Sequence, residues 1–393
     1  GYILWAEARD LASGKTVQDN GDVLLHLVDY LVHYTRKALT ELRQLDARFA
    51  DFRQRYGHAA SAAEQQEHIL DFAREMGALP RQLRADRKAF NRWFGDDAIA
   101  ERYTRQRAER ERSIVFVLGR LGVQCATLFG GAGDDASAAR LWRRLKLEKL
   151  ILPLLSYPGE VRMRSEAFTC LATALQALPV SMQETSLTDS TLKYIYRSAL
   201  ERRQDVWIQC EALTLLKSLS QASLDRALEN RLQQPGEGDD LFVRRHAVRL
   251  LGERLATDAA LAHLAGQVVV DASPAVRQVL PAALTTAPDT LVSELLPRLL
   301  DEDPEAAVRA SALLVIPGLL LRQALFSPLR QAVVRLLGHE HDSFVLRVAL
   351  QVVVQCHRQL QTCPEYGKQW EQAIYPLLAE LHRNADSLAV RRW

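Results

Sequence analysis

The chain has 393 residues, of which 48% are hydrophobic and 25% are charged, and 50 Lys and Arg against 48 Asp and Glu give a formal net charge of +2. These values are typical of globular proteins and exclude a disordered, collagen-like or disulfide-stapled chain. A charge so close to zero also argues against a dedicated nucleic-acid-coating protein, because such domains are strongly basic.

The N-terminal third has the periodicity of amphipathic helices. Residues 21–56 carry apolar side chains at steps of three and four, which predicts one or two long helices that begin near Asp22. Further helices are expected at 61–76, 80–94, 97–112 and 113–129. We therefore expect residues 1–135 to form a helical region, either a bundle or a set of divergent hairpins, and the Gly-rich segment 130–137 to link it to the rest.

Four basic residues share one side of the helix expected at 80–94. At 100° per residue they fall within about 80° of one another; they are Arg81, Arg84, Lys88 and Arg92. Such a face could bind an anion, in nucleic acid, a phospholipid headgroup or an acidic protein. The alternative is a solvated face of an amphipathic helix, partly neutralised by nearby acidic residues.

The longest apolar stretch, residues 113–131, has Arg120 near its centre. An arginine at that depth costs roughly 3 kcal/mol in a bilayer, and the stretch is short for a membrane span. A buried helix fits better, and no transmembrane segment is expected.

No local pattern predicts an enzyme, a cofactor or a metal site. The five cysteines have no C-x-x-C spacing and mostly lie in apolar helical runs, which predicts buried, reduced cysteines in a cytoplasmic protein. The SGKT sequence at residues 13–16 lacks the first glycine of a phosphate loop, since position 9 is Arg9. His339 and His341 are two positions apart, which is unsuitable for joint metal binding on a helix.

From about residue 140 onward, a five-residue motif recurs. A hydrophobic residue is followed by a position that is usually Arg, then by two variable residues, and then by Ala or Leu. We call the second position of this motif the column. The column lies at positions 164, 209, 244, 277, 309, 347 and 391, with a mean spacing of about 38 residues. Gln209 replaces the arginine in one copy, and the last copy is cut off at Trp393. The spacing therefore predicts about six repeats and a truncated seventh in residues 136–393. Because the last copy is truncated, we expect further repeats or another domain to follow.

Each copy has the pattern of a helical hairpin. An acidic residue lies four to six positions before the column, where it can cap the second helix; these residues are Glu160, Asp205, Asp240, Asp271, Asp303, Asp342 and Asp386. The first helix contains a proline in three copies, at Pro153, Pro297 and Pro376. Apolar residues at helical spacing are expected to form a shared core; they include Leu213, Leu215, Leu216, Leu313, Leu314 and Ile316.

This combination of proline, turn Asp, Val-Arg and Ala resembles the HEAT repeat, a member of the armadillo-like helical repeats. The resemblance implies an all-α protein, in which a right-handed α–α superhelix follows the N-terminal helical region. It also implies a ladder of contacts between adjacent repeats through the turn Asp and the helix Arg. Asp271 with Arg277, and Asp303 with Arg309, have the expected six-residue spacing. Gln209 departs from the pattern, so the ladder should be interrupted there.

The resemblance implies a non-catalytic scaffold or adaptor that binds protein partners on its concave surface, within a larger protein or complex. Exposed inner-helix residues would face that surface, and we single out Arg245, Arg249 and Arg254. These arginines could instead serve solubility alone. The alternative function is a HEAT-like nucleic-acid-binding protein, for which the basic helix at 80–94 would be the contact. Residues 151–393 carry 25 basic against 27 acidic residues, which suits a DNA cradle poorly.

Overall fold

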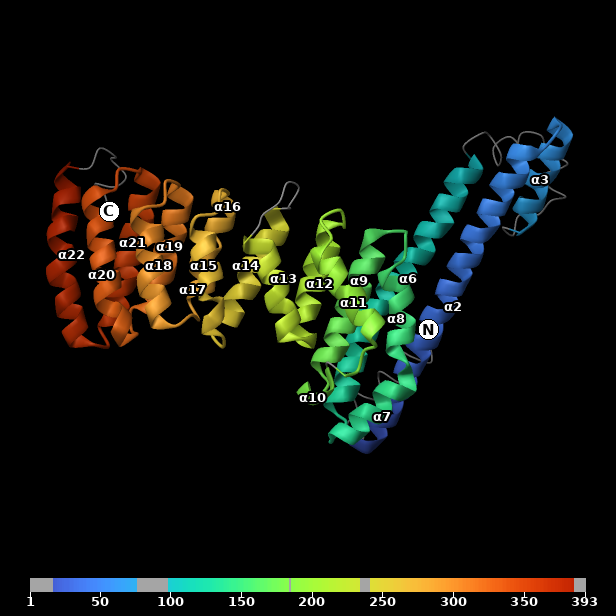
Figure 1. The fold of residues 1–393 in the computed structure, drawn as a ribbon, viewed down its shortest axis with the longest axis horizontal. Helices are drawn as coiled ribbons and strands as arrows, with labels where there is room; N and C mark the ends of the chain where they lie inside the picture. The colour runs from blue at the N-terminus through green and yellow to red at the C-terminus, as the bar shows by residue number, and fades with distance from the viewer. Residues whose placement is uncertain (1–16, 76–97, 184, 234–240, 385–393) are drawn as a thin grey trace. The chain divides into compact units, whose positions relative to one another are not determined.

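The computed structural model describes residues 17–75, 98–183, 185–233 and 241–384. Helices are the regular structure throughout these ranges, with no strand among the described residues, so the predicted all-α class is confirmed. The chain divides into two compact units, residues 1–193 and 194–393 (Figure 1).

The first unit is built on two long helices. In chain order its described helices are α2 (Val17–His58), α3 (Ala62–Glu75), α6 (Ala98–Gly130), α7 (Asp135–Leu145), α8 (Leu147–Leu155), α9 (Val161–Gln176) and α10 (Val180–Gln183), while α11 (Asp189–Leu200) crosses into the second unit. The two helices expected at 97–112 and 113–129 are one continuous helix, α6. No Gly or Pro interrupts the junction between the two expected helices, so the backbone hydrogen bonds continue through it.

Helix α6 is the central element of this unit, because it packs against both α2 and α9. Its Ile99–Gly130 segment is long and apolar enough to cross a membrane by length and composition, but half of the tested window is buried inside the unit. The buried side chains include Ile114, Leu118 and Leu121. Burial against neighbouring helices explains the apolar composition, and the described residues hold no clear transmembrane segment.

A polar cluster ties α2 to α6 and to the loop after α8. Asp46 accepts hydrogen bonds from the Tyr103 and Tyr157 hydroxyls, at 2.7 and 3.1 Å, and Arg107 lies between Asp46 and Glu111. Burial, reinforced by the Asp46 carboxylate, raises the pKa of both phenols to about 12. The two phenols therefore remain hydrogen-bond donors at neutral pH, and the cluster fixes how the helices cross.

The boundary between the compact units lies at residues 193/194, further along the chain than the predicted linker at 130–137. That segment is a short turn in which Asp134 caps α7 by accepting a hydrogen bond from the Ser137 backbone N–H. Because α9 packs on α6, the first hairpin after the turn belongs to the N-terminal unit by its contacts.

The second unit is a succession of helical hairpins. Its described helices are α12 (Val206–Leu219), α13 (Gln221–Gln233), α14 (Leu241–Leu255), η1 (Ala259–Leu261), α15 (Ala262–Val269), α16 (Pro274–Arg277), α17 (Leu280–Leu284), α18 (Asp289–Asp301), α19 (Ala306–Leu319), α20 (Gln323–His339), α21 (Ser343–Leu360) and α22 (Pro364–Asn384). The expected prolines Pro297 and Pro376 lie inside α18 and α22.

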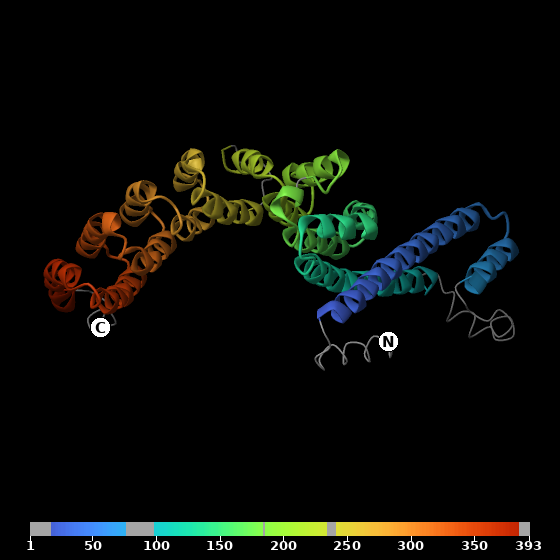
Figure 2. The same ribbon diagram turned by 90° about the horizontal axis from the view of Figure 1, so that it is seen from below.

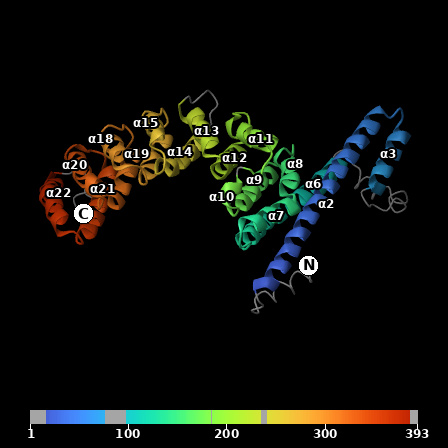
Figure 3. The same cartoon turned by 60° about the horizontal axis from the view of Figure 1, so that its bottom comes forward.

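These hairpins stack in two rows. We call the first the inner row; it consists of α12, α14, α16, α17, α19 and α21, and each helix contacts the next member of the row. The outer row consists of α13, α15, α18, α20 and α22, which contact one another in the same way. Figures 2 and 3 show the two rows side by side within this unit. The arrangement is compatible with a helical-repeat solenoid, in which stacked neighbours share one continuous core.

The core between the rows contains most of the predicted apolar positions. Leu213, Leu216 and Leu313 are fully or almost fully buried, as are Leu215 and Ile316. The prediction for Leu314 is wrong, because its side chain is 57% exposed. Leu314 lies about 100° around α19 from Leu313, which turns it away from the outer row.

The predicted caps differ between hairpins. Asp205 accepts a hydrogen bond from the Trp207 N–H, and Asp342 accepts from Phe344 and Val345, so both cap as expected. Glu160 precedes α9 but makes no side-chain cap. Asp271 and Asp303 accept from Ser273 and Glu305, which lie before their helices, so these carboxylates brace the turn instead. Asp240 and Asp386 lie outside the described residues.

Candidate protein-binding surface

Arginines and carboxylates connect successive hairpins along one edge of the second unit. Arg244 pairs with Asp271, Arg277 with Asp303, and Arg309 with Glu340, and each arginine reaches the acidic residue of the next hairpin. We call these three pairs the arginine ladder. Arg277 and Arg309 also donate to the backbone carbonyls of Asp271 and Asp303, at 2.7 and 2.9 Å. The structure thus brings together all four predicted ladder residues, with Glu340 as the acid of the last described pair.

Two of the three pairs have bidentate geometry. Arg277 donates to both carboxylate oxygens of Asp303, at 2.6 and 2.9 Å, and Arg309 donates to both oxygens of Glu340, at 2.7 and 3.0 Å. Burial opposes ionisation of Glu340, but hydrogen bonds from Arg309 and from the Asp342 backbone outweigh it and lower the pKa of this carboxyl. Planar two-point contacts of this kind fix the orientation of adjacent hairpins as well as stabilising them.

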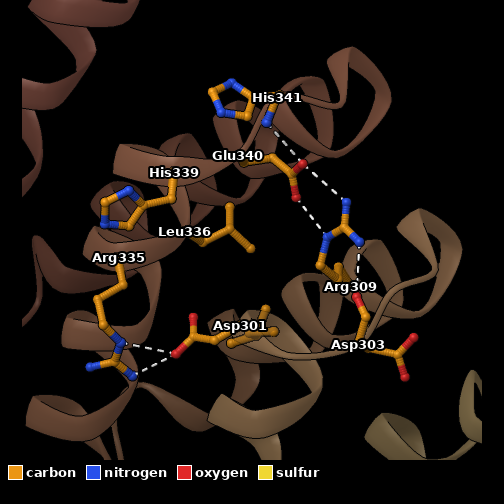
Figure 4. A pocket seen from close by; sticks show the side chains of 9 residues that line it. Asp301, Asp303, Arg309, Arg335, Leu336, His339, Glu340 and His341 are labelled. Carbon is orange, nitrogen blue, oxygen red and sulfur yellow. Dashed lines mark hydrogen bonds and ion pairs between the residues drawn. The ribbon is translucent and has the colours of Figure 1, made fainter.

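A cavity of about 360 Å³ opens beside the last ladder pair (Figure 4). It is lined by Arg309 and Glu340, by the Arg335–Asp301 ion pair, and by His339 and His341. A second cavity of about 250 Å³ lies beside the preceding pair, Arg277 and Asp303. The two hollows therefore lie at equivalent places in successive hairpins, each beside a ladder pair. Figure 4 shows the carboxylates of Asp301 and Glu340 directed at Arg335 and Arg309, and the described residues contain no cluster of three metal-ligating side chains.

The ladder changes partners at the hairpin that lacks its arginine. Gln209 is buried, donates to the Gln204 carbonyl and accepts from Arg231 of α13 at 2.6 Å. Arg231 is fully buried and also donates to the Ala199 carbonyl. In this hairpin an arginine of the outer row, Arg231, makes the polar contacts at the position where the column has Gln209 in place of arginine. The spacing of the column in the sequence could not predict this replacement.

The expectation that Arg254 faces a binding surface is wrong, because its side chain is buried. It donates to both carboxylate oxygens of Asp225 at 2.9 Å, and it also contacts Gln221 and Thr257. These partners lie on α13 and in the loop after α14. Arg254 therefore holds α14 against the outer row.

Arg245 and Arg249 lie on the side of α14 that faces away from the outer row. Arg249 is exposed and Arg245 is half-buried. Phe242 shares this side, because positions 242, 245 and 249 fall within about 60° of one another on a helix. The Nε of Arg245 has no hydrogen-bond partner among the described residues. The structure therefore places two of the three predicted arginines on the free face of the inner row.

The free face of the inner row carries few acids. From α14 to α21 its exposed or half-exposed charged side chains outside the ladder are Arg245, Arg249, Glu253, Arg347 and Arg358. Glu253 is paired with Lys217 of α12. The two middle hairpins contribute small or neutral side chains here, with Leu314 the largest exposed one. This surface is cationic at both ends and nearly neutral between them.

His246 lies in the same part of α14, and we expect it to make the stability of the second unit depend on pH. Its Nε2 lies 2.9 Å from the Thr214 hydroxyl on α12. Burial, together with nearby Arg249, lowers its pKa below the ordinary value of 6.5. The unfolded chain thus binds the proton at a higher pH than the folded one, and stability is lost as pH falls through the region of 6.5.

Acidification from pH 7.5 to 5.5 should therefore lower the melting temperature more for the wild-type chain than for His246→Gln. Glutamine keeps a hydrogen-bonding group near Thr214 but cannot titrate. Melting curves followed by circular dichroism at the two pH values measure the difference, and His263→Gln, at an exposed outer-row position, is the control. Equal acid sensitivity of the wild type and His246→Gln would show that His246 does not contribute.

The other basic face predicted from the sequence is not placed. Arg81, Arg84, Lys88 and Arg92 lie outside the described residues, as does the SGKT segment at 13–16. The five cysteines are all free thiols, three of them buried.

Comparisons with known proteins do not place the chain in a family. No protein-family model matches it, and no curated protein matches it. Among solved structures it is similar to an engineered protein from the Northeast Structural Genomics Consortium, with 16% identity over 93% of this chain and 96% of the other. The TM-score of that match is 0.35, too low to carry an argument about fold or function.

Proposed function

We propose that this chain is a non-catalytic scaffold of the HEAT-like, armadillo-like class, which binds a protein partner on the free face of its inner row. The observation that carries the proposal is that two arginines of α14 form ion pairs within the unit while two others lie on its free face. Arg244 and Arg254 are committed to Asp271 and Asp225, whereas Arg245 and Arg249 point to the free face. Committed arginines hold the stack together, and the remaining two are available to a partner.

The repeated hairpin supports the HEAT-like assignment in detail. Prolines lie within outer-row helices, and an acidic residue lies in each described turn that leads from the first helix of a hairpin to its second, inner-row helix. An arginine follows the first buried residue of α14, α16 and α19. Each element appears in the repeat resemblance drawn from the sequence. The two-row stack supplies the continuous surface that such scaffolds use for binding.

The proposal is tested by reversing the charge of the two available arginines. We expect Arg245→Glu with Arg249→Glu to weaken capture of a partner from native lysate at least tenfold while leaving the melting temperature within a few degrees of wild type. Arg249→Glu alone, at the more exposed position, should give a smaller loss. The matched control is Arg226→Glu with Lys368→Glu, which makes the same charge change at exposed outer-row positions.

Capture that is unchanged in the double variant would contradict the proposal. Recovery of mainly nucleic acid, released when the salt concentration is raised, would support the alternative of a nucleic-acid-binding protein, because phosphate contacts are strongly salt-dependent.

A further inference from the structure

Two large aromatic side chains are exposed beside Arg245 and Arg249. Trp207 is 68% exposed and Phe242 is 64% exposed, and each is the second residue of its inner-row helix. Phe344 has the same place in α21 and is also exposed. In the sequence each of the three follows an acidic residue by two positions, so the aromatic position recurs with the repeat.

The register of α12 against α14 places Trp207 and Phe242 at the same level. Thr214 lies against His246 and Lys217 pairs with Glu253, contacts that join residues 32 and 36 positions apart. The two helices therefore run in the same direction. Trp207 and Phe242 are 35 positions apart, within this register, so both stand at the beginning of adjacent helices on the free face of the inner row.

The charges around this pair are predominantly positive on α14. Going along its free face from Phe242, the next charged residues are Arg245 and Arg249, and the only acid, Glu253, is already paired with Lys217. On α12, Glu211 is half-buried and has an interaction of its own. We define the aromatic–arginine patch as Trp207, Phe242, Arg245 and Arg249.

Resting on the proposed function, we propose that the aromatic–arginine patch binds an acidic protein segment that carries at least one large apolar side chain. Trp and Arg are the residue types that most often dominate binding at protein interfaces. The aromatic pair offers apolar area for the anchor, and the guanidinium groups of Arg245 and Arg249 complement carboxylates, which they can bind through two hydrogen bonds. The neutral, small-residue surface of the next two hairpins leaves room for the segment to continue along the inner row.

Three fluorescein-labelled synthetic peptides of equal length test the proposal on the full chain. The first contains Glu and Leu, the second Lys and Leu, and the third Glu and Ser. By fluorescence anisotropy we expect the Glu–Leu peptide to bind at least tenfold more tightly than either of the others. Trp207→Ala with Phe242→Ala should weaken its binding at least tenfold, as should Arg249→Glu, while Arg226→Glu with Lys368→Glu leaves it unchanged.

The aromatic and arginine variants change exposed positions, and their melting temperatures establish that they remain folded. Equal binding of the Glu–Leu and Lys–Leu peptides would overturn the inference, because the patch would then recognise the apolar side chains of the peptide and not its charge. Tighter binding of a duplex DNA oligonucleotide than of the Glu–Leu peptide, lost in Arg249→Glu, would also overturn it in favour of a phosphate ligand.

The test separates this inference from the proposed function. If Arg245→Glu with Arg249→Glu abolishes partner capture but the Glu–Leu peptide is not preferred, the scaffold function stands and the acidic-segment inference fails. If the peptide binds as expected but the same variant captures its partner normally, the patch is a real binding site and the proposed function of the inner row fails.

Discussion

Arg277→Ala should unfold the second unit more readily than any exposed charge substitution. Arg277 and Asp303 are both buried and joined by two hydrogen bonds, so removing the arginine leaves a buried carboxylate without its counter-charge. Breaking one side of such a pair costs about 3–5 kcal/mol. At roughly 2–4 °C per kcal/mol for a unit of this size, the melting temperature should fall by about 6–20 °C.

The control for this variant is Arg298→Ala, which removes an exposed ion pair within one turn of α18, to Glu302. Exposed pairs of this kind contribute about 0–1 kcal/mol, so its melting temperature should change little. A double variant, Arg277→Ala with Asp303→Ala, should lose less stability than the sum of the two single variants, because the charge left by each is removed by the other. Equal shifts for Arg277→Ala and Arg298→Ala would show that the ladder does not hold the hairpins together.

Gly252→Ala should also destabilise the second unit, by about 1–3 kcal/mol. Helix propensity alone predicts that the substitution would increase stability, because alanine is a better helix former than glycine. A Cβ at Gly252 would lie 2.6 Å from the Cα and 2.8 Å from the Cβ of Ala283. The Thr286 hydroxyl donates to the Gly252 carbonyl at 2.9 Å, so α14 is also joined to the turn that follows α17. One of the two backbones must move to admit a methyl group. Urea unfolding followed by circular dichroism measures the cost.

Gly266→Ala is the same substitution at a helix position with open space, and we expect it to stabilise the protein. Gly266 lies in α15 with no atom within 4 Å of the added Cβ, and alanine is the better helix former by about 1 kcal/mol. This variant should be slightly more stable than the wild type. If both glycine variants were stabilised, α14 and α17 would not approach each other as closely as the structure has them.

The repeated hairpins and their buried residues were predictable because both depend on short-range spacing. A motif that recurs every 38 residues or so indicates stacked helices, and the buried sides of α12 and α19 follow from helical periodicity. The arginine column and its turn acids likewise indicated a ladder. Its step from one hairpin to the next, as in Arg244 with Asp271, came from the family resemblance and depends on how hairpins stack.

Two predictions are wrong, one because of a contact with a distant part of the chain and one because of helix geometry. Arg254 was expected on the free face, but it binds Asp225 of α13, which lies 29 residues earlier in the sequence. Leu314 was expected in the core together with the other apolar residues at helical spacing, but its position one residue after Leu313 turns it to the free face of α19. The sequence singles out Arg245 and Arg249, and it also contains an aromatic residue two positions after Asp205, Asp240 and Asp342, a recurrence from which exposed aromatics at the start of these helices could be predicted.

Hydroxyl-radical footprinting of the chain with and without its captured partner tests most directly whether the free face of the inner row is the binding surface. Trp207, Phe242 and Phe344 are exposed on the inner row, and Tyr375 is an exposed aromatic on the outer row. The account predicts that oxidation of Trp207 and Phe242 falls on binding while that of Tyr375 does not change. Protection of Tyr375 with full reactivity of Trp207 and Phe242 would contradict it.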